Sequence, residues 1–214
     1  MNFVNQIPNL LGLFRIVATP LLMWLILINT PAGHLWAVIL LLLMAISDFL
    51  DGKLARSLQV VSPLGIFLDT ISDKIFVVGA LLPMITHNLL SPWIVLLVVV
   101  REFAISGLRS YAAAEGTVIS AGKWGKQKLT ITVTALVWRL LEAHAATGGV
   151  LGSVPFLAFL FNLWPIPVAL MVIWTIFSGV DYFWKAWPLL RTSWVPRSAA
   201  ETSKEAQNPV AKKS

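Results

Sequence analysis

The chain has 214 residues, of which 57% are hydrophobic and only 12% are charged. Soluble domains carry about 25% charged residues, and apolar runs long enough to cross a bilayer recur here, so a soluble enzyme and a disordered or fibrous chain are excluded. The net charge of +6 indicates basic cytoplasmic loops rather than a nucleic-acid partner. Cysteine is absent, which excludes disulfides and thiolate chemistry.

Hydropathy predicts an all-α integral membrane protein with six transmembrane helices. The expected spans are Leu10 to Ile28, Leu35 to Leu50, Phe67 to Ile85, Trp93 to Ala112, Leu129 to Leu141, and Val168 to Trp187. The fifth span is short and is expected to begin earlier, at Lys126 or Lys128, because a lysine stem can reach the interface. The apolar stretch from Gly148 to Asn162 is broken by prolines and is interpreted as interfacial or re-entrant. Residues 1–190 are expected to form one domain.

Basic residues predict the orientation in the membrane. With six spans both termini share one side, and nearly all basic residues fall on that side, whereas the opposite loops hold only Arg139. By the positive-inside rule both termini are expected in the cytoplasm of a multi-pass cell-membrane protein. The histidines His34, His87 and His144 fall in or beside the outer loops and are interpreted as solvated. The polar, basic tail, residues 191–214, is expected to be disordered.

Acidic residues are concentrated in one short part of the chain. Four of the ten fall between Asp48 and Asp73. Asp48 and Asp51 are three residues apart at the end of the second span, and Asp69 and Asp73 are four residues apart at the start of the third. Such spacings place both members of a pair on one helix face.

The loop between these two spans is expected to contain Pro63 and Gly65. An antiparallel hairpin would then bring the four carboxylates together in a polar cavity near the cytoplasmic interface. Carboxylates at that depth are costly without compensation. Oxygen ligands without cysteine or histidine favour Mg²⁺ or Mn²⁺, so a metal site is predicted.

The spacing of the hairpin residues is diagnostic. Eight residues stand at fixed positions, in the order Asp48-x2-Asp51-Gly52-x2-Ala55-Arg56-x8-Gly65-x3-Asp69-x3-Asp73. This pattern resembles, at every defined position, the signature of the CDP-alcohol phosphotransferase (phosphatidyltransferase) family. The resemblance implies a six-helix membrane enzyme, usually a homodimer, with a dinuclear metal site. Such an enzyme moves a phosphoalcohol group from a CDP-linked donor to a second hydroxyl and releases CMP.

The same resemblance implies a role for each position. Asp48, Asp51 and Asp69 are expected metal ligands, and Asp73 is expected both to touch metal and to act as the catalytic base. The residues expected to bind the CDP-diacylglycerol donor are Asn9, Gly52, Ala55, Arg56, Ser62 and Gly65. The small residues among them let the pyrophosphate approach the backbone, and the planar guanidinium of Arg56 suits phosphate.

Two further segments resemble the bacterial branch of the family that makes phosphatidylglycerophosphate. The first is Ile7-Pro8-Asn9-Leu10-Leu11-Gly12-Leu13-Phe14-Arg15, in which Gly12 stands where that branch usually has threonine. Arg15 is a candidate for the nucleotide end and equally for a basic residue that holds the helix at the inner interface. In the second segment, from Val100 to Lys128, Arg101 and Glu102 are expected to face the bundle interior.

A basic cluster suggests the acceptor. Arg109, Lys126 and Lys128 lie at cytoplasmic ends of neighbouring spans and are expected to bind the phosphate of glycerol 3-phosphate. The implied reaction, in phospholipid biosynthesis, transfers the phosphatidyl group of CDP-diacylglycerol to glycerol 3-phosphate. Three alternatives stay open: the basic residues only enforce topology, the acceptor is inositol phosphate, serine or phosphatidylglycerol, or the aspartates line the path of a cation transporter.

Overall fold

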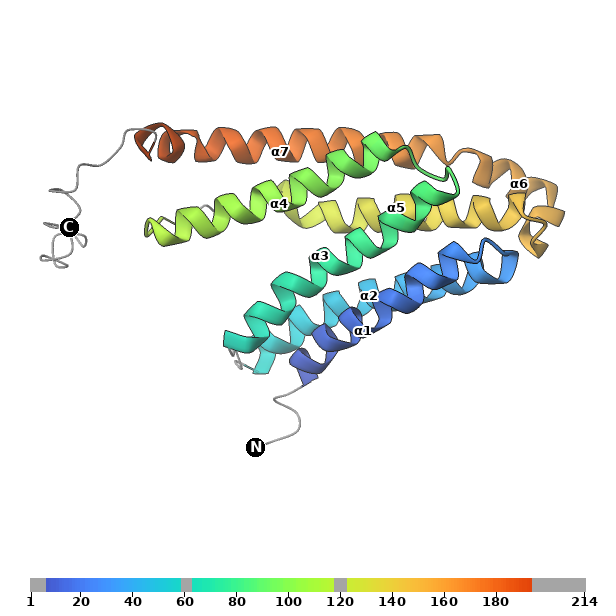
Figure 1. Ribbon diagram of the computed structural model, residues 1–214, viewed down its shortest axis with the longest axis horizontal. Coiled ribbons are helices and arrows are strands. Elements are labelled where there is room, and N and C mark those ends of the chain that lie inside the picture. The colour runs from blue at the N-terminus through green and yellow to red at the C-terminus, as the bar shows by residue number, and fades with distance from the viewer. Residues whose placement is uncertain (1–6, 59–62, 118–122, 194–214) are drawn as a thin grey trace, which may run out of the picture.

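The fold is helical throughout the part of the chain that the structure describes, which confirms the expected all-α class. The computed structural model describes residues 7–58, 63–117 and 123–193. Inside its helices, the side chains of residues 7–8, 51–58, 63–64, 66, 123–126 and 192–193 lie outside the description. The elements in chain order are α1 (Ile7–Leu27), α2 (Pro31–Leu58), α3 (Pro63–Thr86), α4 (Pro92–Ala114), α5 (Lys123–Ala146), the 3-10 helix η2 (Val150–Ser153), α6 (Pro155–Asn162) and α7 (Pro165–Ser193) (Figure 1).

The six predicted spans fall in the six long helices, apart from Ile28, which follows α1 by one residue. The fifth helix begins earlier than its apolar segment, as expected, but at Lys123 rather than at Lys126 or Lys128. Three segments are long and apolar enough to cross a membrane, namely Asn9–Leu27, Pro31–Leu50 and Pro155–Arg191. The helices α3, α4 and α5 each carry at least three charged residues, which lowers their hydropathy.

Proline marks the start of most helices. Five of the described α-helices begin at one, in chain order Pro31, Pro63, Pro92, Pro155 and Pro165. The first turn of a helix leaves its N–H groups without intrahelical partners, so a residue that lacks an N–H and has a fixed φ fits there. The expectation that Pro63 and Gly65 lie in the loop is therefore wrong, since both belong to α3. Likewise α2 continues to Leu58, so the motif residues after Asp48 are helical.

The α2–α3 hairpin is spread apart by α1. The helix α1 packs closely against both α2 and α3, whereas α2 and α3 barely touch each other. On the other side α5 packs against α2 and α7, and α4 packs mainly against α7 (Figure 1). The two acidic helices therefore face each other across a space that α1 borders, rather than forming a closed hairpin.

The core is apolar, and so is much of the exterior. The core includes Leu22, Leu41, Leu81, Leu136 and Met171, one from each of the helices α1, α2, α3, α5 and α7. Large apolar side chains are also exposed along the outside of the bundle, among them Trp24, Trp36, Trp93 and Trp184. Soluble monomers rarely expose extended apolar surface. A helix bundle with an apolar core and an apolar outer surface, and with its few charged residues paired between helices, suits a lipid environment.

The far end of the bundle, where α5 meets η2 and α6, holds a charge that is buried rather than solvated. The Nε of Arg139 donates to the carbonyl of Leu89 at 2.7 Å, and its guanidinium lies 4.4 Å from the ring centre of Trp164. Arg139 also pairs with Glu142 one turn along α5. All of these partners lie within the protein, so Arg139 is anchored to the bundle.

The expectation that all three histidines are solvated is wrong for two of them. His34 and His144 are buried, and Nδ1 of His144 lies 2.7 Å from the carbonyl of Pro31. Both residues lie in helices that pack against each other, His34 in α2 and His144 in α5, and this packing encloses their imidazole rings. Hydropathy alone placed both residues in or beside loops. Only His87 is hydrogen-bonded at an exposed position, to the carbonyl of Leu27 at 3.0 Å.

Two terminal regions complete the fold. The stretch from Gly148 to Asn162 forms η2 and the short helix α6 before α7 begins, at the end of the molecule away from the last turn of α2 and the first turn of α3 (Figure 1). Its interfacial or re-entrant placement stays a prediction. The helix α7 runs to Ser193, past the expected domain end at 190. The rest of the expected disordered tail, residues 194–214, lies outside the described part.

Gly79 permits the close approach of α1 to α3 and supplies a test of it. A Cβ at position 79 would overlap the Cγ2 of Thr19, whose hydroxyl is held by a 2.7 Å hydrogen bond to the carbonyl of Arg15. We expect Gly79→Ala to destabilise the protein by about 1–3 kcal/mol through overpacking. Gly107→Ala in α4 is the matched control, because a Cβ at position 107 would have no neighbouring atom within 4 Å, and it should be neutral or stabilising. Thermal unfolding in detergent compares them, and an unchanged midpoint for Gly79→Ala would contradict the packing.

Candidate active site

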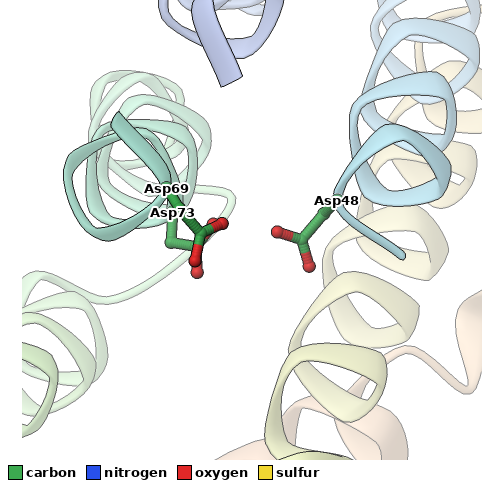
Figure 2. A group of neighbouring side chains, drawn as sticks. All are labelled: Asp48, Asp69 and Asp73. Carbon is green, nitrogen blue, oxygen red and sulfur yellow. The ribbon is translucent and has the colours of Figure 1, made fainter. Parts of the chain in front are cut away.

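Three acidic side chains from two helices meet in one place. Asp48 projects from α2, and Asp69 and Asp73 project from α3 toward it (Figure 2). One carboxylate oxygen from each lies within 4.8 Å of the others. Asp69 and Asp73 share a helix face because they are four residues apart. The predicted gathering of carboxylates is therefore present for these three residues.

Arg15 is the positive partner of this cluster. It reaches in from α1, its side chain is fully buried, and one guanidinium nitrogen pairs with both Asp48 and Asp73. The second nitrogen, Nη2, lies 3.3 Å from Asp69. The planar guanidinium presents donors in several directions, which lets one side chain serve three carboxylates. The position of α1 between α2 and α3 makes this possible.

The balance of charge in the cluster is negative. Three carboxylates and one guanidinium leave two negative charges, close to a fully buried arginine. The carboxylates of Asp69 and Asp73 keep 58% and 47% of their surface exposed, whereas Asp48 keeps 17%. The two α3 residues can therefore take further partners from solvent. Hard carboxylate oxygens with a surplus negative charge fit a divalent cation such as Mg²⁺ or Mn²⁺.

The other predicted donor-binding residues lie around the same end of these helices. Asn9 is half-buried on α1, less than two turns before Arg15, and Gly65 is half-buried on α3, four residues before Asp69. The remaining motif residues in α2 follow Asp48 on the same helix, but their side chains lie outside the description: Asp51, Gly52, Ala55 and Arg56. Ser62 lies outside the described residues altogether.

Gly12 faces α3 beside the acidic cluster. A Cβ at this position would lie 3.6 Å from the Cβ of Leu68 and 3.8 Å from the Oγ of Ser72. Ser72 is fully buried and donates to the carbonyl of Asp69 at 3.1 Å. The residue that departs from the usual threonine therefore lies at the contact between α1 and α3, directly against the turn that carries Asp69.

The expected acceptor residues are only partly brought together. Lys128 on α5 pairs with Glu102 of α4 and lies within electrostatic range of Asp73. Arg109 is exposed on α4 and lies in electrostatic range of Tyr182 of α7. The side chain of Lys126 lies outside the description. Of the two expected acceptor residues with described side chains, Lys128 is therefore the one within electrostatic range of the acidic cluster.

The pairing of Arg15 with three carboxylates was not predicted from the sequence. The two roles expected for Arg15 were a contact with the nucleotide and an anchor at the membrane interface, and neither describes this pairing. The available signal was its position as the one charged residue in an otherwise apolar first span. A charge within such a span has to find partners of opposite sign, and the nearby acidic hairpin offered them.

Comparison with known proteins assigns the family. The sequence model described as CDP-alcohol phosphatidyltransferase matches residues 5–177, which include α1 through α6 and the first part of α7. The chain belongs to the CDP-alcohol phosphatidyltransferase family. The match contains all eight motif positions and the helix that carries Arg15.

Similar proteins extend the family assignment over nearly the whole chain. A Bacillus subtilis protein named CDP-diacylglycerol–glycerol-3-phosphate 3-phosphatidyltransferase is 32% identical over 88% of this chain and 98% of its own length. A Pseudomonas fluorescens protein of the same name is 31% identical over 87% of this chain and 93% of its own. A Streptomyces coelicolor protein named cardiolipin synthase (CMP-forming) is 37% identical over 46% of this chain and 47% of its own length.

The role of Arg15 in this family member can be tested through stability. We expect Arg15→Met to lower the stability measured in chelator by on the order of 2 kcal/mol, less than for a fully buried pair because two partners are half-exposed. Adding Mg²⁺ should raise the unfolding midpoint of Arg15→Met more than that of the wild type, because a cation can replace the missing charge. Arg191→Met, at an exposed arginine of α7, is the control. Equal responses of Arg15→Met and wild type to Mg²⁺ would refute this charge balance.

Proposed function

We propose that this chain is a CDP-diacylglycerol–glycerol-3-phosphate 3-phosphatidyltransferase, which transfers the phosphatidyl group to glycerol 3-phosphate and releases CMP. The observation that carries the proposal is the cluster of Asp48, Asp69 and Asp73 on two facing helices in a chain of the CDP-alcohol phosphatidyltransferase family. Relatives that match nearly their whole length carry this name, which supports the choice of acceptor.

The membrane setting follows from the same premises. The six long helices act as six spans, with both termini in the cytoplasm and the acidic cluster at the cytoplasmic side. The three less apolar helices can lie in the bilayer because charges on each of them, Asp73, Glu102 and Lys128, pair with other residues of the protein. Residues 1–190 form the catalytic domain of a homodimer, and the basic composition of the tail, 191–214, suits anionic lipid.

Two divalent cations, Mg²⁺ or Mn²⁺, would be held by Asp48, Asp51, Asp69 and Asp73. Such bound cations supply neutralisation of the pyrophosphate and of the charge that develops on departing CMP. The protein's own contribution is orientation. Arg15 holds the three described carboxylates toward one point, so that they need little rearrangement when the donor arrives.

The remaining residues divide between the two substrates. Donor binding falls to Asn9, Gly52, Ala55, Arg56, Ser62 and Gly65, and acceptor phosphate binding to Arg109, Lys126 and Lys128. The acyl chains of CDP-diacylglycerol stay in the bilayer, against the apolar outer faces of the helices, while glycerol 3-phosphate enters from the cytoplasm. This division places the water-soluble acceptor on the side where the basic residues are expected.

The chemical step needs one proton acceptor, for which we propose Asp73. Its carboxylate removes the proton of the primary hydroxyl of glycerol 3-phosphate, and the oxygen bonds to the β-phosphorus of CDP-diacylglycerol. The pyrophosphate P–O bond breaks, and its electron pair leaves with CMP. Asp73 suits this role because it is half-exposed and lies within electrostatic range of Lys128, a proposed ligand of the acceptor phosphate.

An acceptor panel tests the assignment. Purified protein with Mg²⁺ and CDP-diacylglycerol is offered glycerol 3-phosphate, inositol phosphate, serine or phosphatidylglycerol, and CMP release is followed. Glycerol 3-phosphate should give the fastest release, and a chelator should abolish it. Phosphatidylglycerol is the second candidate acceptor, because a relative named cardiolipin synthase (CMP-forming) matches part of the chain. Release with another acceptor but none with glycerol 3-phosphate would overturn the acceptor assignment.

Substitution of the proposed base tests the mechanism. Asp73→Asn keeps the size of the side chain but removes its basicity, so we expect turnover to fall by roughly 100-fold or more, in the range of a general base. Asp181→Asn provides the matched control, since Asp181 pairs with Lys185 on α7 outside the cluster and should leave turnover near wild type. Near-normal CMP release by Asp73→Asn would exclude it as the base.

The transporter alternative makes a different prediction. Cation passage alone would give metal uptake into proteoliposomes without CMP release. The motif argues against it, because a conduction path does not require the glycines and Arg56 at their fixed spacing beside the aspartates.

A further inference from the structure

A second buried ion network lies where α4, α5 and α7 meet. The Nη1 of Arg101 donates to Oε1 of Glu102 at 3.1 Å, and its Nη2 donates to Oγ of Ser178 at 3.0 Å. The other oxygen of Glu102, Oε2, pairs with Nζ of Lys128. Each carboxylate oxygen therefore holds one cation. This single carboxylate on α4 joins a residue of α5 to a residue that also binds α7.

The network is enclosed and carries a surplus of positive charge. The side chains of Arg101, Glu102 and Lys128 expose only 10%, 11% and 16% of their surface. Two cations against one anion leave one positive charge inside the bundle. The Nε of Arg101 is buried and has no hydrogen-bond partner among the described residues. Because an unpaired buried donor is costly, the network has capacity for a further acceptor of hydrogen bonds.

The network adjoins the acidic cluster. Lys128 is held by Glu102 and at the same time lies within electrostatic range of Asp73. A lysine ammonium group stands on a flexible four-carbon stem, so its position depends strongly on the group with which it pairs. With Glu102 absent, Arg101 and Lys128 would be two like charges in one enclosed place, and they would repel each other.

We propose that Glu102 is a positioning residue for the acceptor: it fixes Lys128 and Arg101 in one positively charged pocket that receives the phosphate of glycerol 3-phosphate. The proposal rests on the proposed function and deepens it. Glu102 does not touch the phosphate, because two anions repel. It acts through the cations, and the net positive charge that they retain attracts the acceptor to the side of Asp73 where its hydroxyl has to react.

The first measurement separates the two substrates. Glu102→Gln removes the charge at nearly constant volume, and KM is determined for each substrate. We expect KM for glycerol 3-phosphate to rise by roughly tenfold or more, and KM for CDP-diacylglycerol to change by less than about twofold. Glu142→Gln is the matched control, since Glu142 is also a partly buried partner of an arginine on a helix of this bundle. It lies fourteen residues, about 21 Å, along α5 from Lys128 and should leave both KM values near wild type.

A double-mutant cycle tests whether Glu102 acts through Lys128. Lys128→Met alone should raise KM for glycerol 3-phosphate, and Glu102→Gln should raise that KM by a smaller factor in the Lys128→Met protein than in wild type, because only the contact with Arg101 is then left to lose. A purely structural role would make the two effects add and would raise both KM values. Glu102→Asp, which keeps the charge on a shorter stem, should recover part of the acceptor affinity and carries the same comparison where Glu102→Gln does not fold.

The outcomes distinguish the inference from the function beneath it. Release of CMP by wild type with an unchanged or lowered KM for glycerol 3-phosphate in Glu102→Gln overturns the positioning role and leaves the proposed function standing. The absence of CMP release by wild type with glycerol 3-phosphate overturns the proposed function, and the role of Glu102 is then refuted with it. Raised acceptor KM with additive effects of Glu102→Gln and Lys128→Met also contradicts the inference.

Discussion

The end of the bundle that holds the acidic cluster depends on one buried arginine that serves three carboxylates. A guanidinium within an apolar span is costly without partners, and so are carboxylates that face each other from two helices. Arg15 satisfies both requirements only if α1 lies between α2 and α3, which is the packing observed. The close approach of α1 to α3 in turn needs a residue without a side chain at the tightest contact, and Gly79 provides it. Charge balance therefore determines which helices are neighbours.

Two clusters of opposite sign lie next to each other in this arrangement. The carboxylates around Arg15 leave a negative surplus, and the network around Glu102 leaves a positive one, with Lys128 paired in the second and within electrostatic range of Asp73 in the first. A substrate that carries a phosphate at one end and a hydroxyl at the other would be oriented by this pair of fields. Its phosphate would be drawn to the positive network, which would leave its hydroxyl toward Asp73. Orientation of this kind lowers the entropic cost of the reaction.

The helices and the acidic cluster were predictable because their signals are local. Apolar length locates a span whatever its neighbours, and a four-residue spacing places Asp69 and Asp73 on one helix face without knowledge of the fold. The role of Arg15 was not predictable in this way, since its partners lie 33 to 58 residues away and depend on the insertion of α1. The same limit applies to His34 and His144, which are enclosed by the packing of α2 against α5.

The two ends of the bundle treat buried charge differently, and the difference indicates which end does chemistry. At the far end Arg139 is neutralised by Glu142 and further held by a backbone carbonyl and the ring of Trp164, so no net charge remains for a ligand. At the near end neither cluster is neutral, and the aspartates of α3 remain half-exposed. Charges kept only for stability tend toward local balance, because each imbalance raises the cost of burial. A protein that keeps one negatively and one positively charged cluster can offset the free-energy cost of these unbalanced charges by binding ligands of opposite sign. Divalent cations with the donor suit the negative cluster, and an anionic acceptor suits the positive one.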